Sequence, residues 1–120
     1  MRNQPKYNFF KNTSYALNGL KDMIQNESSF KIELIIAIVL IPVIIFLDTT
    51  LVNKALMFIS LMLMLIAETV NSAIERVVDL VTLEHHEMAG RAKDVGSSIV
   101  FLSIVVFVVT WAIVILDIVN

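Results

Sequence analysis

Acidic and amide side chains interrupt a long apolar segment near the middle of this chain. The run ETVNSAIERVVD contains Glu68, Asn71, Glu75 and Asp79. At about 100° per residue, these four positions fall within roughly 80° of arc on a helix. Ionisable groups at membrane depth are costly, so they normally face a bundle interior or a wet cavity and mark an ion, proton or substrate site. This acidic stripe is the candidate functional site, although Asp79 alone also fits a solvated helix end.

Three apolar stretches predict an all-α membrane protein with a single domain. Of the 120 residues, 58% are hydrophobic, which is typical of membrane proteins. We expect spans at about residues 30–47, 51–81 and 95–118, each near the roughly 20 residues that cross a hydrocarbon core. Polar and amphipathic residues precede the first stretch, which is the wrong order for a secretory leader. The chain has no cysteine, so it has neither disulfides nor thiol chemistry.

Basic residues are unevenly distributed around these spans. Lys54 alone lies near the connection between the first and second spans. Seven others precede the first span, lie at its very start or lie between the second and third spans: Arg2, Lys6, Lys11, Lys21, Lys31, Arg91 and Lys93. The positive-inside rule then makes the amino terminus and the second connection cytoplasmic. Trp111 falls towards the outer interface, where an aromatic belt residue is expected.

Residues 8–26 show a helical pattern that is amphipathic rather than membrane-spanning. Such a helix lies in the interface plane with its apolar face down. If it continued to Glu27, that carboxylate would project on the apolar side. Asn26, Ser28 and Ser29 are cap-type residues, so a solvated Glu27 at a helix junction is the alternative.

Polar residues also occur at the start of the first span and between the last two. Glu33 is expected to reach back to the headgroups, and Pro42 to bend its helix. Adjacent histidines in LEHHEMAGRAKD point about 100° apart on a helix, which argues against a chelating pair. Gly90 and Gly96 could let the backbone approach a phosphate, although a merely solvated charged loop is the simpler interpretation.

Two function classes remain open from the residues alone. One is a cation or proton conductor that uses Glu68, Glu75 and Asp79 as a relay. The other is a metal-dependent enzyme acting at the membrane surface. Glycine occurs only at positions 19, 90 and 96, which excludes the G-x-x-x-x-G-K-[ST] and G-x-G-x-x-G phosphate loops.

The run ETVNSAIERVVD followed by HHEMAGRAKDVGSS resembles the prokaryotic diacylglycerol kinase family of small integral-membrane lipid kinases. The resemblance covers essentially the whole chain. It implies a homotrimeric bundle of three-span subunits in the bacterial inner membrane, with active sites at subunit contacts. It also implies ATP as phosphoryl donor, Mg²⁺ as cofactor, diacylglycerol as acceptor and no nucleic-acid partner. Undecaprenol kinase is the alternative within the family, although GRAKDxGS looks more like the diacylglycerol branch.

The same resemblance assigns roles residue by residue. Glu68 falls on the catalytic base, Glu27 and Glu75 on the acids that hold the nucleotide-bound metal, and Asn71 on a positioning amide. The nucleotide-binding candidates are Tyr15, Glu27, Glu75, Glu84, His86, Lys93 and Asp94. The lipid-binding candidates are Glu68, Phe30, Glu33, Ser97 and Trp111. Asn8 stands where some relatives carry arginine and Ala16 where some carry serine, so the chain departs from the family in its surface helix.

Helical spacing separates the two central carboxylates by depth. Glu68 and Glu75 lie about 10 Å apart along the axis, too far to bind one metal directly. Glu75, nearer the cytoplasmic end, is expected to meet a water-borne magnesium nucleotide together with Glu27. Glu68 lies deeper and is expected to meet the hydroxyl of a lipid substrate.

Overall fold

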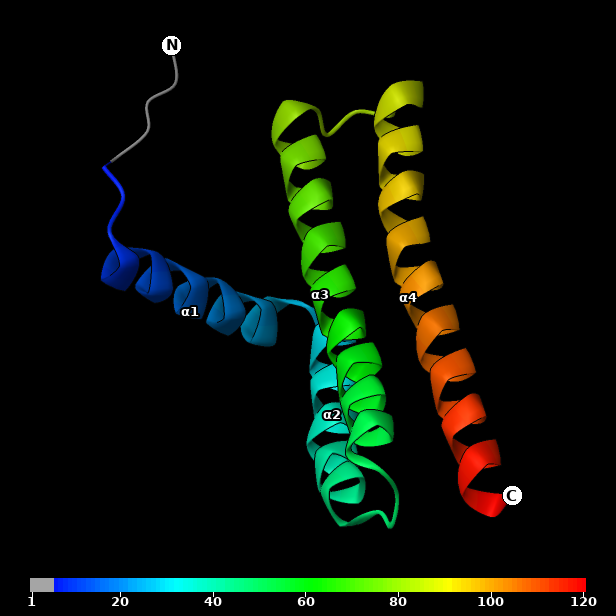
Figure 1. The fold of residues 1–120 in the computed structure, drawn as a ribbon. Helices are drawn as coiled ribbons and strands as arrows, with labels where there is room; N and C mark the ends of the chain where they lie inside the picture. The colour runs from blue at the N-terminus through cyan, green and yellow to red at the C-terminus, as the bar shows by residue number, and fades with distance from the viewer. Residues whose placement is uncertain (1–5) are drawn as a thin grey trace.

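The computed structural model describes residues 6–120, which form four helices (Figure 1). These are α1 (Phe9–Asn26), α2 (Ser28–Phe46), α3 (Leu51–Val81) and α4 (Glu87–Val119). No strand occurs in this part of the chain, and α2, α3 and α4 are each long and apolar enough to cross a membrane. The all-α class with three candidate spans is thereby confirmed. Arg2, used above to predict the topology, lies outside the described residues.

Side chains cap the amino ends of three helices. The Asn8 Oδ1 atom accepts a hydrogen bond from the Lys11 N–H at 3.1 Å, which starts α1. Thr50 caps α3 in the same way, and the Nδ1 atom of His86 accepts from the Met88 N–H at 3.2 Å to start α4. Each cap satisfies a backbone donor that has no partner within its helix, which fixes where the helix begins.

A single residue joins α1 to α2. Glu27 has extended backbone angles (φ −117°, ψ 108°), while Asn26 and Ser28 are already helical. The Glu27 N–H donates to the Met23 carbonyl oxygen at 2.9 Å, which closes the last turn of α1. The predicted junction is therefore present, but Glu27 itself forms it and the neighbouring cap-type residues do not. Its side chain consequently does not follow the apolar face of α1.

Helix α3 is the centre of the bundle, and it packs against both α2 and α4. Its buried residues recur every three or four positions, as expected for one face of a helix. They are Met57, Ser60, Leu61, Met64, Leu65, Ala67, Glu68 and Ser72. Helix α1 projects sideways from the start of α2, and α3 and α4 continue beyond its level (Figure 1). This arrangement is that of a surface helix beside a bundle of spans.

Helix α4 begins at Glu87, eight positions before the predicted span. Only residues 82–86 connect it to α3, so Gly90, Arg91, Lys93 and Asp94 lie on a helix and not in a loop. The interpretation of these residues as a charged loop was wrong, because apolarity reports where a helix enters the membrane, whereas helix geometry continues into water whenever its residues permit. Helix α2 likewise continues through Pro42.

Candidate active site

Exposure increases along the acidic stripe of α3. Glu68 is buried, with 9% of its surface exposed. Asn71 and Glu75 are half-buried, and Asp79 is exposed. The stripe therefore runs from the interior of the bundle to the end of α3 that extends beyond α1. A lipid held in the membrane and a solute in water can approach opposite ends of one helix face.

Glu33 of α2 lies beside the buried end of this stripe. Its Oε2 atom is buried and receives no hydrogen bond from residues 6–120. Its carboxyl group lies close to that of Glu68. Glu33 thus turns towards α3 instead of reaching back to the headgroups, contrary to the expectation from its place near the helix start. Two acidic side chains from different helices therefore lie near one another at the buried end of the stripe.

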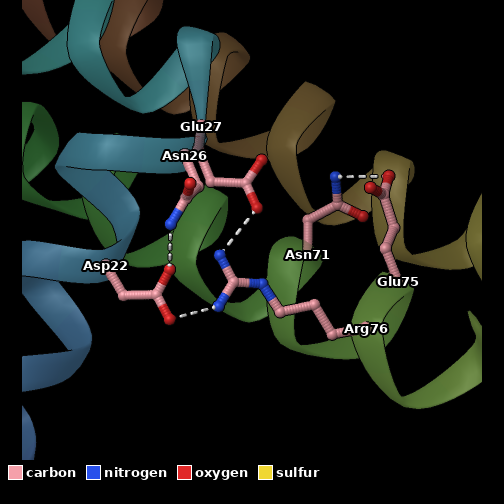
Figure 2. Close-up of polar contacts among 6 residues, drawn as sticks. All are labelled: Asp22, Asn26, Glu27, Asn71, Glu75 and Arg76. Carbon is pink, nitrogen blue, oxygen red and sulfur yellow. Dashed lines mark hydrogen bonds and ion pairs between the residues drawn. The ribbon is translucent and has the colours of Figure 1, made fainter. Parts of the chain in front are cut away.

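Asn71 is fixed between Glu75 and α4. Its Nδ2 atom donates a long hydrogen bond of 3.4 Å to the Glu75 Oε1 atom (Figure 2). Its Oδ1 atom is buried without a donor and lies against Gly96, where a Cβ atom would approach it to 2.5 Å. The space at Gly96 is therefore occupied by the Asn71 amide and does not admit a phosphate. The contact with Glu75 supports a positioning role for Asn71.

We expect Gly96→Ala to disturb the acidic stripe and Gly90→Ala to leave the fold intact. The new methyl group at position 96 must displace the Asn71 amide, whereas a methyl group at position 90 meets no atom within 4 Å. Because alanine favours helix over glycine, Gly90→Ala should stabilise α4 by about 0.5–1 kcal/mol. Thermal unfolding should be measured for both variants, with a lower midpoint expected for Gly96→Ala and a higher one for Gly90→Ala. Equal behaviour of the two would contradict the proposed role of the Gly96 contact.

Arg76 joins Glu27 to α3. Its Nη2 atom lies 2.9 Å from Glu27 Oε1, and its Nη1 atom lies 2.9 Å from Asp22 Oδ2 (Figure 2). The Asn26 Nδ2 atom also donates to Asp22, at 2.7 Å. The hydrogen bond from Arg76 and then that from Asn26 hold the pKa of Asp22 below its usual value. Glu27 is thereby attached to the residue that follows Glu75, within one chain.

Sequence reasoning missed Arg76 and Asp22 as parts of the site. The acidic residues of α3 dominate its sequence pattern, and Arg76 lies outside the stripe that they form. An arginine next to Glu75 on a spanning helix also requires a partner. This requirement could have marked Arg76 as part of the site. Its two partners lie 54 and 49 positions away, beyond the reach of helical periodicity.

A polar hollow of about 310 Å³ lies where α3 and α4 are connected. Among its lining residues are three of the predicted nucleotide-binding residues, Glu84, His86 and Lys93. The Lys93 Nζ atom forms an ion pair of 2.7 Å with Asp79 Oδ1. Asp79, which the sequence left as a possible solvated helix end, therefore has a specific partner.

The remaining nucleotide-binding candidates lie outside this hollow. Asp94 is exposed on α4. Tyr15 lines a different hollow, also of about 310 Å³, near the start of α1 with Lys6 and Lys11. It is 12 positions before Glu27, about 18 Å along a helix. A single chain therefore brings together some of the predicted nucleotide-binding residues, whereas Tyr15 lies apart from them.

The predicted lipid-binding residues have different surroundings. Phe30 is 3% exposed and belongs to the hydrophobic core. The Trp111 Nε1 atom donates to the Met57 carbonyl oxygen at 3.3 Å, and its ring packs on Phe107 with centroids 5.0 Å apart. Its polar edge thus faces α3 and not an outer headgroup. Ser97 is exposed on α4 and is free to contact lipid.

The carboxylates of Glu27 and Glu75 fit a magnesium nucleotide by type and number. Mg²⁺ prefers oxygen ligands and is commonly held by one or two carboxylates together with substrate phosphates. Arg76 engages only the Oε1 atom of Glu27, and Asn71 only the Oε1 atom of Glu75. The second oxygen of each carboxylate remains available. Among the described residues, no cluster of three or more acidic, histidine or cysteine side chains could hold a metal by protein ligands alone.

Comparison with known proteins gives a family for this chain. The family described as prokaryotic diacylglycerol kinase matches residues 14–115. A diacylglycerol kinase of Haemophilus influenzae is 42% identical over 99 residues, covering 82% of this chain and 84% of the relative. That of Escherichia coli K12 is 40% identical over 103 residues, covering 86% and 84%.

A third relative extends this result to another organism. The diacylglycerol kinase of Pseudomonas aeruginosa is 41% identical over 104 residues, covering 87% of this chain and 85% of the relative. The family match includes the acidic stripe, Glu27 and the polar hollow between α3 and α4. The chain belongs to the prokaryotic diacylglycerol kinase family.

Proposed function

We propose that this protein transfers the γ-phosphoryl group of ATP to the hydroxyl of diacylglycerol and so produces phosphatidic acid. The observation that carries the proposal is the graded burial of the acidic stripe, with Glu68 inside the bundle and Glu75 nearer water. A lipid kinase must meet one substrate in the membrane and the other in water. Family membership supports the reaction class.

Each part of the acidic stripe has a task in this reaction. Phosphoryl transfer requires positioning, neutralisation of phosphate charge and a group that accepts the proton of the attacking hydroxyl. The lipid hydroxyl oxygen bonds to the γ-phosphorus, the bond to the bridging β–γ oxygen breaks, and the hydroxyl proton passes to Glu68. Asn71 orients Glu75 through its amide N–H. Bound Mg²⁺, held by Glu27 and Glu75, would supply charge neutralisation on the phosphates.

The nucleotide is proposed to extend from Glu75 towards the polar hollow between α3 and α4. Lys93 carries a positive charge there. Only one of its three N–H donors is used by Asp79, so the others can bind a phosphate oxygen. Glu84 and His86 line the same hollow. His86 already uses its Nδ1 atom as the α4 cap, so its Nε2 atom is the one available to a ligand.

The proposed location is the cytoplasmic face of the bacterial inner membrane, with the amino terminus in the cytoplasm. The distribution of basic residues supports this orientation. Helix α1 joins α2 at the end opposite the α2–α3 connection, and α3 and α4 are connected at that same end of the bundle, beyond the level of α1 (Figure 1). ATP is available on that side, which is consistent with the position of Glu75 and Lys93.

A coupled assay of ATP consumption with added lipid tests the function. The purified full chain should consume ATP with diacylglycerol, and the lipid product should be phosphatidic acid. Faster turnover with undecaprenol would favour the alternative acceptor. If the protein consumes no ATP with either lipid but conducts ions in vesicles, the conductor would be favoured. A relay has no need of Lys93 or of Glu27, so the presence of both near the acidic stripe favours the kinase.

We further propose a homotrimer whose active sites lie at subunit contacts. Large apolar side chains remain exposed along α2, α3 and α4 and can pack against other copies. Glu27 reaches α3 within its own chain, so one subunit would supply the carboxylates. Tyr15, at the far end of α1, would serve a neighbouring subunit. The mass of the oligomer in native mass spectrometry should be that of three chains.

Subunit mixing should reveal which residues are shared. Mixed trimers of Tyr15→Ala and Glu68→Gln should regain activity at low ATP, because some sites then combine an intact Tyr15 with an intact Glu68. Trimers of Glu27→Gln and Glu68→Gln should not, because both residues would come from one chain. Restoration by the second mixture, in samples shown to contain mixed trimers, would reverse the assignment of Glu27.

A further inference from the structure

The guanidinium group of Arg76 is bound by the carboxylates of Asp22 on α1 and of Glu27, the residue that joins α1 to α2. We propose that Arg76 is a positioning residue, which clamps the end of α1 to α3 and holds Glu27 in place for the metal-nucleotide. The clamp consists of Asp22, Arg76 and Glu27. This inference rests on the proposed function in one respect, namely the role of Glu27 towards the metal.

The clamp has the geometry expected of a planar, forked donor. Two different nitrogens of Arg76 are used, each 2.9 Å from a carboxylate oxygen (Figure 2). A lysine offers a single point of charge and cannot reproduce this fork. Asn26 also binds Asp22 at 2.7 Å, so the α1 half of the clamp is itself held in position.

Apart from Met23, which is buried in the hydrophobic core, few contacts join α1 to α3. A groove of about 400 Å³ lies between them, with Gly19 and Met23 of α1 on one side and Thr69 and Ser72 of α3 on the other. The close packing of α1 is with α2. The clamp therefore bridges two helices beside an open groove, and its loss should free the carboxyl end of α1.

The clamp also leaves Glu27 available for its proposed task. Arg76 occupies only one oxygen of that carboxylate. The side chains of Arg76, Asp22 and Glu27 are 44%, 46% and 30% exposed, so solvent screens both ion pairs. Such pairs are weak enough to adjust when a cation arrives, and they still restrict the rotamers of Glu27 beforehand. Preorganisation of this kind increases affinity by lowering the entropic cost of binding.

Four variants of the full chain in lipid nanodiscs test the proposal. Arg76→Gln removes the clamp, Arg76→Lys keeps its charge, and Asp22→Asn weakens its α1 half without altering Glu27. Lys21→Gln is the matched control, because it removes a positive charge from an exposed residue that takes no part in the three ion pairs of residues 6–120. Amide hydrogen exchange of α1, KM for magnesium ATP and kcat are measured for each.

Arg76→Gln should raise the exchange rate of α1 amides and raise KM for magnesium ATP by about three- to tenfold, as expected for a pair of exposed ion pairs. The change in kcat should stay below about twofold, because Glu68 is untouched. Asp22→Asn should change both quantities in the same direction by less, and Arg76→Lys should rescue only part of the loss. Lys21→Gln should behave as the unmodified chain.

Two results would overturn the clamp. If Arg76→Gln changes neither α1 exchange nor KM, the ion pairs hold nothing in place. If Arg76→Gln raises KM while Asp22→Asn leaves both readouts unchanged, Arg76 binds the nucleotide directly and does not act through Glu27. Hydrogen exchange requires no turnover, so it tests the clamp even if the protein fails to phosphorylate diacylglycerol. Failure of the proposed function is recognised separately, by the absence of lipid phosphorylation in the unmodified chain.

Discussion

Glu68→Gln should reduce lipid phosphorylation by at least about 10²-fold, the usual contribution of a general base, and leave magnesium-nucleotide affinity within a few fold. The amide cannot accept the proton of the lipid hydroxyl, but it fills the same buried space. It can also donate to the neighbouring Glu33 carboxyl group, so the fold should be preserved. Turnover and nucleotide titration, measured on the same detergent preparation, separate the two effects.

Glu87→Gln is the matched control for this experiment. It removes the same charge from an exposed position in the first turn of α4. Its activity should be close to that of the unmodified chain. Substantial turnover by Glu68→Gln, or a large loss of nucleotide affinity in that variant, would mean that Glu68 is not the base.

Glu75→Gln should show the opposite pattern, with a loss of magnesium-nucleotide affinity. Changing a residue that merely supports a metal ligand commonly lowers metal affinity by 10–100-fold, so loss of a ligand oxygen should cost at least about tenfold. Titration at fixed magnesium concentration measures this directly. Raising the magnesium concentration should recover part of the affinity.

Glu27→Gln should weaken magnesium-nucleotide binding in the same direction. That variant also loses its ion pair with Arg76, so its effect should exceed the effect of Arg76→Gln. The difference between the two variants isolates the contribution of the Glu27 oxygen to the metal. Unchanged nucleotide affinity in both Glu75→Gln and Glu27→Gln would remove these residues from the metal site.

The sequence predicted the helices well where apolarity and helix geometry coincide. The second span was expected at 51–81 and α3 has those bounds, because Thr50 caps one end and the stripe continues the helix to the other. Residues 87–94 were interpreted as part of a loop because they are charged, but they form the first turns of α4. A helix that leaves the membrane keeps its hydrogen bonds while its side chains become polar.

The site was predictable as a stripe but not as a set of contacts. Periodicity placed Glu68, Asn71 and Glu75 on one face of α3, and the graded burial of that face agrees with it. Periodicity gives no information on which face of α2 meets α3, so the turn of Glu33 towards Glu68 was missed. The partners of Arg76 depend on where α1 lies in space, which no local pattern specifies.

The one-residue junction between α1 and α2 has a mechanical consequence. A surface helix follows the plane of the lipid headgroups, whereas α2 follows the direction across the bilayer. Any change in the angle between those directions falls on the two backbone torsions of Glu27, because no other residue separates the helices. The direction of the Glu27 carboxylate therefore depends on the local orientation of the membrane surface relative to α2.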